Sequence, residues 1–194
     1  MGKTRLEAFS DGVLAIIITI MVLELKVPHG DDLRTLLELW PVFFSYVLSF
    51  LYIGIYWNNH HHLLHTVKKV SAGILWANLH LLFWLSLVPF STGWMGENHF
   101  GQWTVFVYAF NLFMAAIAYT ILVFCIKAVH GDGSDIDRAI GSDTKGKISL
   151  AGYVAAMISS FFMPALGMLF TVGVALIWFI PDRRIERVLV DEKN

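Results

Sequence analysis

The sequence is poor in charged residues and nearly devoid of cysteine, and both shortages restrict what it can be. Lys, Arg, Asp and Glu supply 15% of the 194 residues, whereas hydrophobic residues supply 57%. Soluble domains carry about 25% charged residues, so a water-soluble fold is excluded. Cys125 is the single cysteine, which excludes an internal disulfide and a cysteine metal cluster. The formal net charge of −1 gives no indication of a nucleic-acid partner.

Motifs typical of enzymes are also missing. The sequence contains no Ser-His-Asp order, no phosphate-binding loop and no pair of carboxylates on one predicted helix face. Residues 171–175 read Thr-Val-Gly-Val-Ala and lack the Tyr-Gly that completes a TVGYG potassium filter. They also lie within an apolar run, where helical hydrogen bonds use the backbone carbonyls. We therefore expect no enzyme, no cofactor and no TVGYG filter.

Hydrophobic residues come in six long blocks, which predict an all-α polytopic membrane protein with six transmembrane helices in a single domain, residues 1–194. A helix of about 20 apolar residues crosses about 30 Å of hydrocarbon. The last two blocks are short and meet at Pro164, so one long kinked segment is the alternative; residues 148–180 are too many for one crossing, which favours a hairpin. The blocks are residues 6–25, 40–59, 71–90, 103–127, 148–163 and 165–180.

The distribution of Lys and Arg predicts the orientation in the bilayer, because cytoplasmic segments carry an excess of both. Of the 14 Lys and Arg residues, only Lys26 and Arg34 fall on one side of the six blocks. We therefore expect the N and C termini in the cytoplasm. The residues on the predicted cytoplasmic side are Lys3, Arg5, Lys68, Lys69, Lys127, Arg138, Lys145, Lys147, Arg183, Arg184, Arg187 and Lys193.

Two polar segments are expected outside the bilayer. Residues 131–147 contain several Gly, Asp and Ser residues and predict a flexible cytoplasmic connector. Residues 30–38 predict a short amphipathic helix across the outer mouth.

Polar side chains at the predicted cytoplasmic end of the first block need partners. A charge that faces lipid, such as that of Asp11, costs about 2.5–3.5 kcal/mol. The second block ends, and the third begins, at the same depth. One interpretation is a structural network that locks three helices together; the other is that Asp11 or His60 titrates to set a gate. The partners available there are Trp57, Asn59, His60, Asn78 and His80.

Four histidines follow the second block. His61 and His65 have the i, i+4 spacing of a metal-ligand pair, with His60 and His62 beside them. No carboxylate or cysteine lies nearby in sequence, so we favour a histidine cluster at the membrane interface over a metal site.

The start of the first block carries a specific pattern, R-x-x-x-F-S-D, formed by Arg5, Phe9, Ser10 and Asp11. It resembles the motif of the transmembrane protein 175 family of lysosomal-type potassium channels, in its short bacterial branch with one six-helix unit. This pattern is specific in this context and lies at the helix start, as in the family.

Two further matches strengthen the resemblance. Trp57 and His60 resemble the W-x-x-H of the family, and Asn78 with residues 87–90, Leu-Val-Pro-Phe, resembles its third helix. The resemblance covers the first half of the chain; the later blocks match in hydropathy and length only.

The resemblance implies a homo-tetrameric cation channel in the bacterial plasma membrane that is potassium-selective or weakly selective, with potassium or other monovalent cations as the permeant species. The first helix would line the pore. Ile16, Ile20 and Leu23, which share one helix face by their spacing, would form the hydrophobic constriction, and Thr19 would present a hydroxyl to the ion. The motif residues would hold this helix against Trp57, His60 and Asn78.

The sequence allows two roles for Glu24 at the outer end of the first helix, and it allows two other classes of function. Glu24 could form a cation-attracting ring or pair with Lys26. A proton-coupled secondary transporter using Asp11 and His60 is the alternative function, although no inverted repeat is evident. A non-conducting membrane scaffold is the third.

Overall fold

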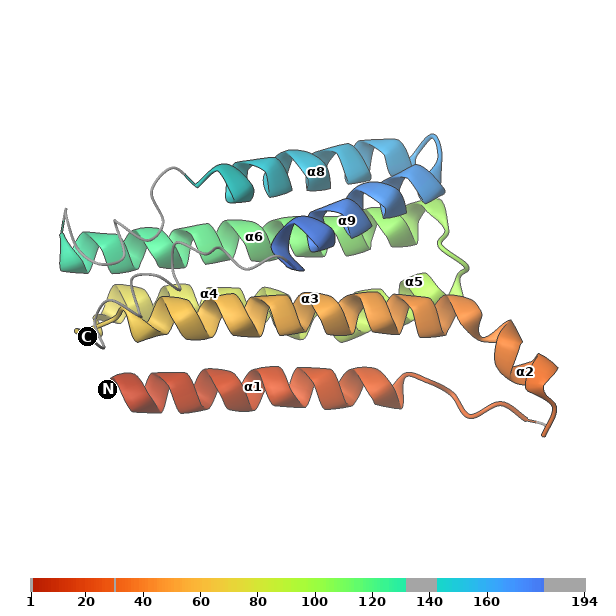
Figure 1. The fold of residues 1–194 in the computed structure, drawn as a ribbon, viewed down its shortest axis with the longest axis horizontal. Helices are drawn as coiled ribbons and strands as arrows, with labels where there is room; N and C mark the ends of the chain where they lie inside the picture. The colour runs from red at the N-terminus through yellow and green to blue at the C-terminus, as the bar shows by residue number, and fades with distance from the viewer. Residues whose placement is uncertain (1, 30, 132–142, 180–194) are drawn as a thin grey trace.

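The computed structural model describes residues 2–29, 31–131 and 143–179, and within these ranges all regular secondary structure is helical (Figure 1). This confirms the all-α prediction. Large apolar side chains are exposed along the bundle, among them Trp76 at 73%, Phe124 at 67% and Leu169 at 65%. The helices are α1 Lys3–Leu23, α2 Leu33–Glu38, α3 Trp40–His65, α4 Ala72–Ser86, α5 Val88–Glu97, α6 Gln102–His130, α8 Thr144–Ser160 and α9 Pro164–Phe179.

The lengths of these helices fit a protein that crosses a membrane several times. Among the described residues, four helical stretches are long and apolar enough to cross, when α4 and α5 are counted as one stretch, and α9 is a shorter apolar helix. The chain is thus an integral multi-pass membrane protein. Six crossings and cytoplasmic termini stay predictions.

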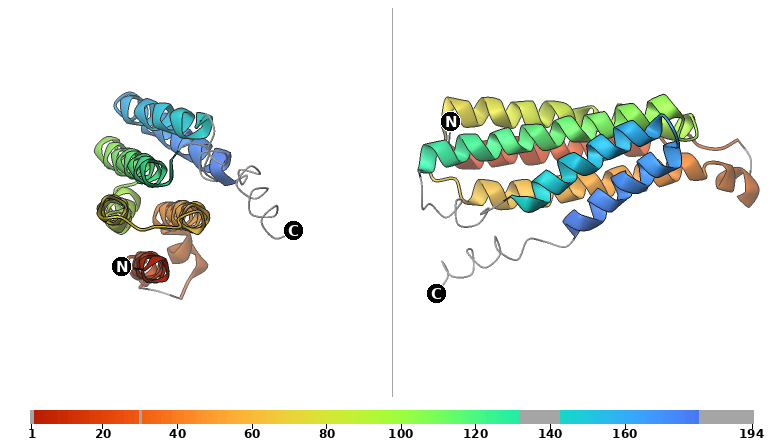
Figure 2. Two further views of the ribbon diagram at one scale, coloured as in Figure 1. Left: turned by 90° about the vertical axis from the view of Figure 1, so that its left-hand side faces the viewer. Right: turned by 90° about the horizontal axis from the view of Figure 1, so that it is seen from above.

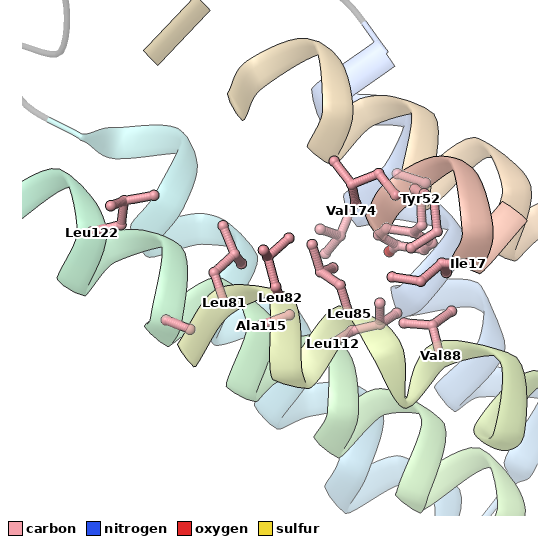
Figure 3. Close-up of a cluster of buried hydrophobic side chains, with 14 of the residues drawn as sticks. Ile17, Tyr52, Leu81, Leu82, Leu85, Val88, Leu112, Ala115, Leu122 and Val174 are labelled. Atoms are coloured by element: carbon pink, nitrogen blue, oxygen red, sulfur yellow. The ribbon is translucent and has the colours of Figure 1, made fainter. Parts of the chain in front are cut away.

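The long helices form an elongated bundle with α1 at one edge (Figures 1 and 2). α1 contacts α3, α4 and α5, while α6 packs between α4 and the pair α8 and α9. The core between them contains side chains from α1, α3, α4, α5, α6 and α9, including Ile17, Tyr52, Leu81, Leu112 and Val174 (Figure 3). α1 is therefore covered by its own chain on one side only.

The third predicted block, residues 71–90, is longer in the structure and is broken. α4 ends at Ser86, and α5 continues to Glu97, with Pro89 in its first turn. Proline cannot donate a helical hydrogen bond, so a break inside the bilayer needs other partners. Asn111 on α6 supplies them: its side-chain amide bonds the Ser91 hydroxyl at 3.2 Å and, in the orientation that satisfies its neighbours, donates to the Trp84 carbonyl at 2.9 Å.

The last two helices are separated by a turn over residues 161–163 and pack closely. α8 starts at Thr144, earlier than the predicted block, because Asp143 caps it by accepting the Gly146 amide at 2.9 Å. Close packing of α9 on α8 requires Gly167, where an added Cβ would lie 2.9 Å from the Ala156 carbonyl oxygen.

The two predicted polar segments are only partly described. Most of the expected connector, residues 132–142, lies outside the described residues, and residues 144–147 belong to α8 rather than to a loop. The helix expected within residues 30–38 is α2, which has no buried residue and lies at the end of the bundle opposite the N terminus (Figure 1).

Candidate functional site

α1 has two different faces. The face toward its own bundle buries residues at intervals of three and four, namely Leu6, Ser10, Leu14, Ile17 and Met21. The opposite face carries the residues predicted to form the constriction: Ile16 is 58% exposed, Ile20 43% and Leu23 78%. An uncovered apolar stripe therefore runs along α1, opposite the stripe that anchors it.

Thr19 lies on the same uncovered face. Its hydroxyl donates to the Ile16 carbonyl at 2.9 Å, one turn back along the helix. The hydroxyl proton therefore takes part in a hydrogen bond within α1, and the oxygen can act only as an acceptor toward groups outside the bundle. Such an oxygen can contact a cation.

A buried polar cluster joins the inner face of α1 to α3 and α4. Asn78 on α4 donates from Nδ2 to the Ser10 hydroxyl at 3.0 Å, and its Oδ1 lies 2.7 Å from Nε2 of His60 on α3. Because an amide oxygen only accepts, Nε2 of His60 carries the proton in this bond. The three residues are between 0% and 2% exposed, so the cluster ties three helices together in the core.

A second polar contact lies beside this cluster at the surface. The indole nitrogen of Trp57 on α3 donates to Oδ1 of Asp11 at 3.0 Å, which meets the need of the carboxylate for a partner. Trp57 also stacks on His61, with ring centroids 6.1 Å apart. Lys3 adds a tie that we did not predict, donating to the His65 carbonyl at 2.7 Å.

Two motif residues lie apart from these contacts. Phe9 is 49% exposed, and Arg5 is exposed and forms no hydrogen bond or ion pair with any residue that the structure describes. Within one chain they do not hold α1 against α3 or α4. Their side chains lie on the uncovered side of α1.

Two residues predicted as possible partners for Asp11 form hydrogen bonds with other residues instead. Asn59 donates to the Ile55 carbonyl at 2.8 Å, and His80 accepts from the Trp84 indole at 3.0 Å, each on its own helix. One residue along a helix turns the side chain by about 100°, and two residues by about 200°. Asn59 next to His60, and His80 two residues after Asn78, therefore point away from the cluster.

The histidines in the last turns of α3 form an aromatic cluster. The rings of His61 and His65 have centroids 5.0 Å apart and are nearly perpendicular. In the described ranges, no three His, Cys, Asp or Glu side chains are grouped so as to hold a metal ion.

At the other end of α1, the structure bears on the second of the two roles considered for Glu24, pairing with Lys26. Lys26 forms its ion pair with Glu97 at the end of α5, not with Glu24. The hydrogen bond from Lys26 to Glu97, with the charge of Glu97, raises the pKa of the Lys26 ammonium, so Lys26 stays charged at neutral pH. Sequence reasoning missed Glu97 because it ended the third block at residue 90.

A groove of about 630 Å³ runs along α1 against α5. Ile16, Ile20 and Glu24 form one wall, and Phe90 and Gly93 form part of the other. The carboxylate of Glu24 lies along α5, since an added Cβ on Gly93 would be 3.3 Å from Oε2. The groove thus continues the uncovered stripe of α1 to an acidic end.

Comparisons with known proteins identify relatives, one of which matches 97% of the chain. The family model described as endosomal/lysosomal potassium channel TMEM175 matches residues 5–89. A potassium channel of Chryseobacterium sp. (strain P1-3) is 58% identical over 189 residues, covering 97% of this chain and 98% of its own length. The human endosomal/lysosomal proton channel TMEM175 is 36% identical over 83 residues, 37% of this chain and 16% of its own length.

A solved structure agrees with these relatives. The crystal structure of a lysosomal potassium-selective channel TMEM175 homolog from Chamaesiphon minutus matches with a TM-score of 0.80 at 30% identity. The match covers 93% of this chain and 97% of that one. The similarity in fold therefore extends to the later helices, for which the sequence motifs gave no match.

Proposed function

This chain belongs to the TMEM175 channel family and is a cation channel rather than an enzyme, and from this premise we propose that it conducts potassium, selectively or with weak preference, through a pore lined by α1. The observation that carries the proposal is the uncovered stripe on α1, which bears Ile16, Thr19, Ile20 and Leu23. We take residues 1–194 as a single channel domain in a bacterial plasma membrane.

One copy of α1 at the edge of a bundle cannot enclose a path, so the proposal requires several chains. We propose a homo-tetramer in which four copies of α1 face one axis. Rings of Ile16, Ile20 and Leu23 side chains would then make a narrow apolar neck that closes by dewetting. Passage requires the neck to widen or the ion to shed part of its water.

Preference for potassium would follow from dehydration, since the larger ion releases its water at a smaller cost. The outward lone pairs of Thr19 replace part of that water within the neck. Glu24, at the acidic end of the groove, would raise the local concentration of monovalent cations. The permeant ion is the only small partner in this scheme, and no cofactor is needed.

The polar cluster is assigned a positioning role. Ser10, Asn78 and His60 would fix the rotation of α1, and with it the direction of the uncovered stripe. Asp11 and Trp57 would add a tie at the surface, and the exposed Arg5 and Phe9 would act between chains. A proton relay through Asp11 and His60 has less support, because each is bonded to a different partner.

Flux through liposomes tests the proposal. We expect purified protein to pass potassium down a gradient and Ile16→Asn to raise the leak, because a polar ring keeps the neck wet. Ile158→Asn on α8 is a matched control, since Ile158 is 59% exposed and Ile16 58%, and it should leave flux unchanged. If liposomes that contain the wild-type protein pass no potassium under any gradient, the proposal is refuted.

A further inference from the structure

A second cavity, of about 50 Å³, lies among α3, α6, α8 and α9, and no residue of α1 lines it. Five aromatic side chains supply much of its wall: Tyr52, Tyr56, Tyr119, Tyr153 and Trp178. The rings of Tyr56 and Tyr119 are in edge-to-face contact at 6.3 Å, which fixes their positions. The pore proposal makes no use of this cavity.

Of the six hydroxyl groups in the wall, four donate their protons to backbone carbonyls. Tyr52 donates to a backbone carbonyl at 2.6 Å, Tyr119 at 3.3 Å, Thr120 at 2.9 Å and Ser149 at 2.8 Å. The indole N–H of Trp178 is used in the same way, donating to Ser149 at 2.7 Å. These four hydroxyl groups and the indole therefore offer a ligand oxygen lone pairs and aromatic rings rather than protons, and the hydroxyls of Tyr56 and Tyr153 complete the polar wall.

Among the described residues that line the cavity, Asp143 is the one that carries a charge. Its Oδ1 accepts the Gly146 amide at 2.9 Å, which fixes the carboxylate at the start of α8. Lys145 lies nearby, but its ammonium is 5.8 Å from the centre of the Trp178 ring and does not line the cavity. A carboxylate together with aromatic rings and oxygen acceptors favours a cation with N–H donors.

From these observations we infer that the cavity between α3, α6, α8 and α9 binds a small primary alkylammonium ion. The ammonium would donate to the wall oxygens and offset the charge of Asp143, while a short alkyl chain contacts the tyrosine rings. A cavity of about 10–15 Å³ already holds one water molecule, so this cavity of about 50 Å³ has room for a small ligand of a few heavy atoms. An anion is disfavoured by Asp143, and a quaternary ammonium lacks the N–H groups that the oxygens can accept.

Calorimetry on the full chain in detergent tests the inference, with propylammonium chloride as the probe. We expect saturable binding, and binding about tenfold or more weaker for propan-1-ol and for tetramethylammonium, which is about 1.4 kcal/mol or more. The alcohol tests the charge and the quaternary ion tests the N–H donors. Because no flux is measured, failure here is distinct from failure of the channel proposal.

Two variants and a control localise the binding. Asp143→Asn removes the charge and keeps a good helix cap, so it should weaken binding at least about tenfold without unfolding α8. Tyr119→Phe keeps the ring and removes one acceptor, and should weaken binding less. Asp31→Asn, an equal charge change at an exposed residue remote from the cavity, should have no effect. Absence of saturable binding, equal binding of propan-1-ol, or unchanged binding by Asp143→Asn would overturn the inference.

Discussion

Replacing Ser10 with alanine removes one atom from the cluster that we propose fixes the rotation of α1. The lost oxygen accepts from Nδ2 of Asn78 at 3.0 Å in a site that is fully buried. Hydrogen bonds between helices in membranes average about 0.6 kcal/mol and reach about 1.7, and a buried polar group left unpaired costs about 1–3 kcal/mol. We therefore expect Ser10→Ala to lower the free energy of unfolding by about 1–2 kcal/mol.

Ser86→Ala is the matched control. Ser86 also donates to a carbonyl of its own helix, Phe83 at 2.7 Å, as Ser10 does to Leu6 at 2.9 Å, but Ser86 is exposed and has no bond to another helix in the described chain. Both changes remove a hydroxyl that donates to a carbonyl of its own helix, so the loss of that bond is common to the two variants. Unfolding by titration with SDS, followed by tryptophan fluorescence at one protein concentration, compares them.

A double-mutant cycle makes the comparison specific to the cluster. Combining Ser10→Ala with Asn78→Ala isolates the energy of that one contact, which we expect near 0.6–1.7 kcal/mol. If Ser10→Ala and Ser86→Ala differ by no more than a few tenths of a kcal/mol, or if the cycle shows no coupling, the reasoning about this cluster is refuted.

Two further predictions concern packing and a loop. Gly96→Ala places a Cβ 2.8 Å from the Val42 backbone and should destabilise the chain by about 1–3 kcal/mol. Gly54→Ala has open space around the new Cβ and should stabilise the chain by up to about 1 kcal/mol. Thermal unfolding compares the two variants, and a higher melting temperature for Gly96→Ala than for Gly54→Ala would contradict this prediction. His130→Ala removes the ring nitrogen that accepts the Lys68 and Lys69 amides at 2.9 and 3.3 Å, so hydrogen exchange at these two amides should accelerate while α6 itself exchanges as before; unchanged protection would show that this contact does not hold the loop.

The sequence allowed the family and part of the site to be predicted. The R-x-x-x-F-S-D pattern identified the TMEM175 family, which the comparisons confirm. The sequence predicted that three residues lie at the same depth in the bilayer, because hydropathy gives the position of each residue along its helix. These residues are Ser10, His60 and Asn78. Depth does not give rotation about a helix axis, which is why Asn59 and His80 were included although both face away.

The remaining differences come from side chains that act across large separations in sequence. Asn111 lets α5 continue past Pro89, and no local pattern around residue 90 reveals this partner on α6. The pairing of Lys26 with Glu97 joins residues 71 apart, beyond the reach of any spacing rule. The acceptor-rich cavity depends on where each hydroxyl proton goes, which only the arrangement of α3, α6, α8 and α9 decides.

The central claim is that the uncovered stripe of α1 faces a wet axis, and cysteine accessibility tests it most directly. After Cys125→Ala removes the native thiol, single cysteines at Ile16, Ile20 and Leu23 are exposed to a charged, water-borne thiol reagent during potassium flux, with buried Ile17→Cys as the control. The account predicts modification and block at the three stripe positions and none at the control. Protection of all three from the charged reagent, with labelling by a lipid-borne reagent instead, would contradict it.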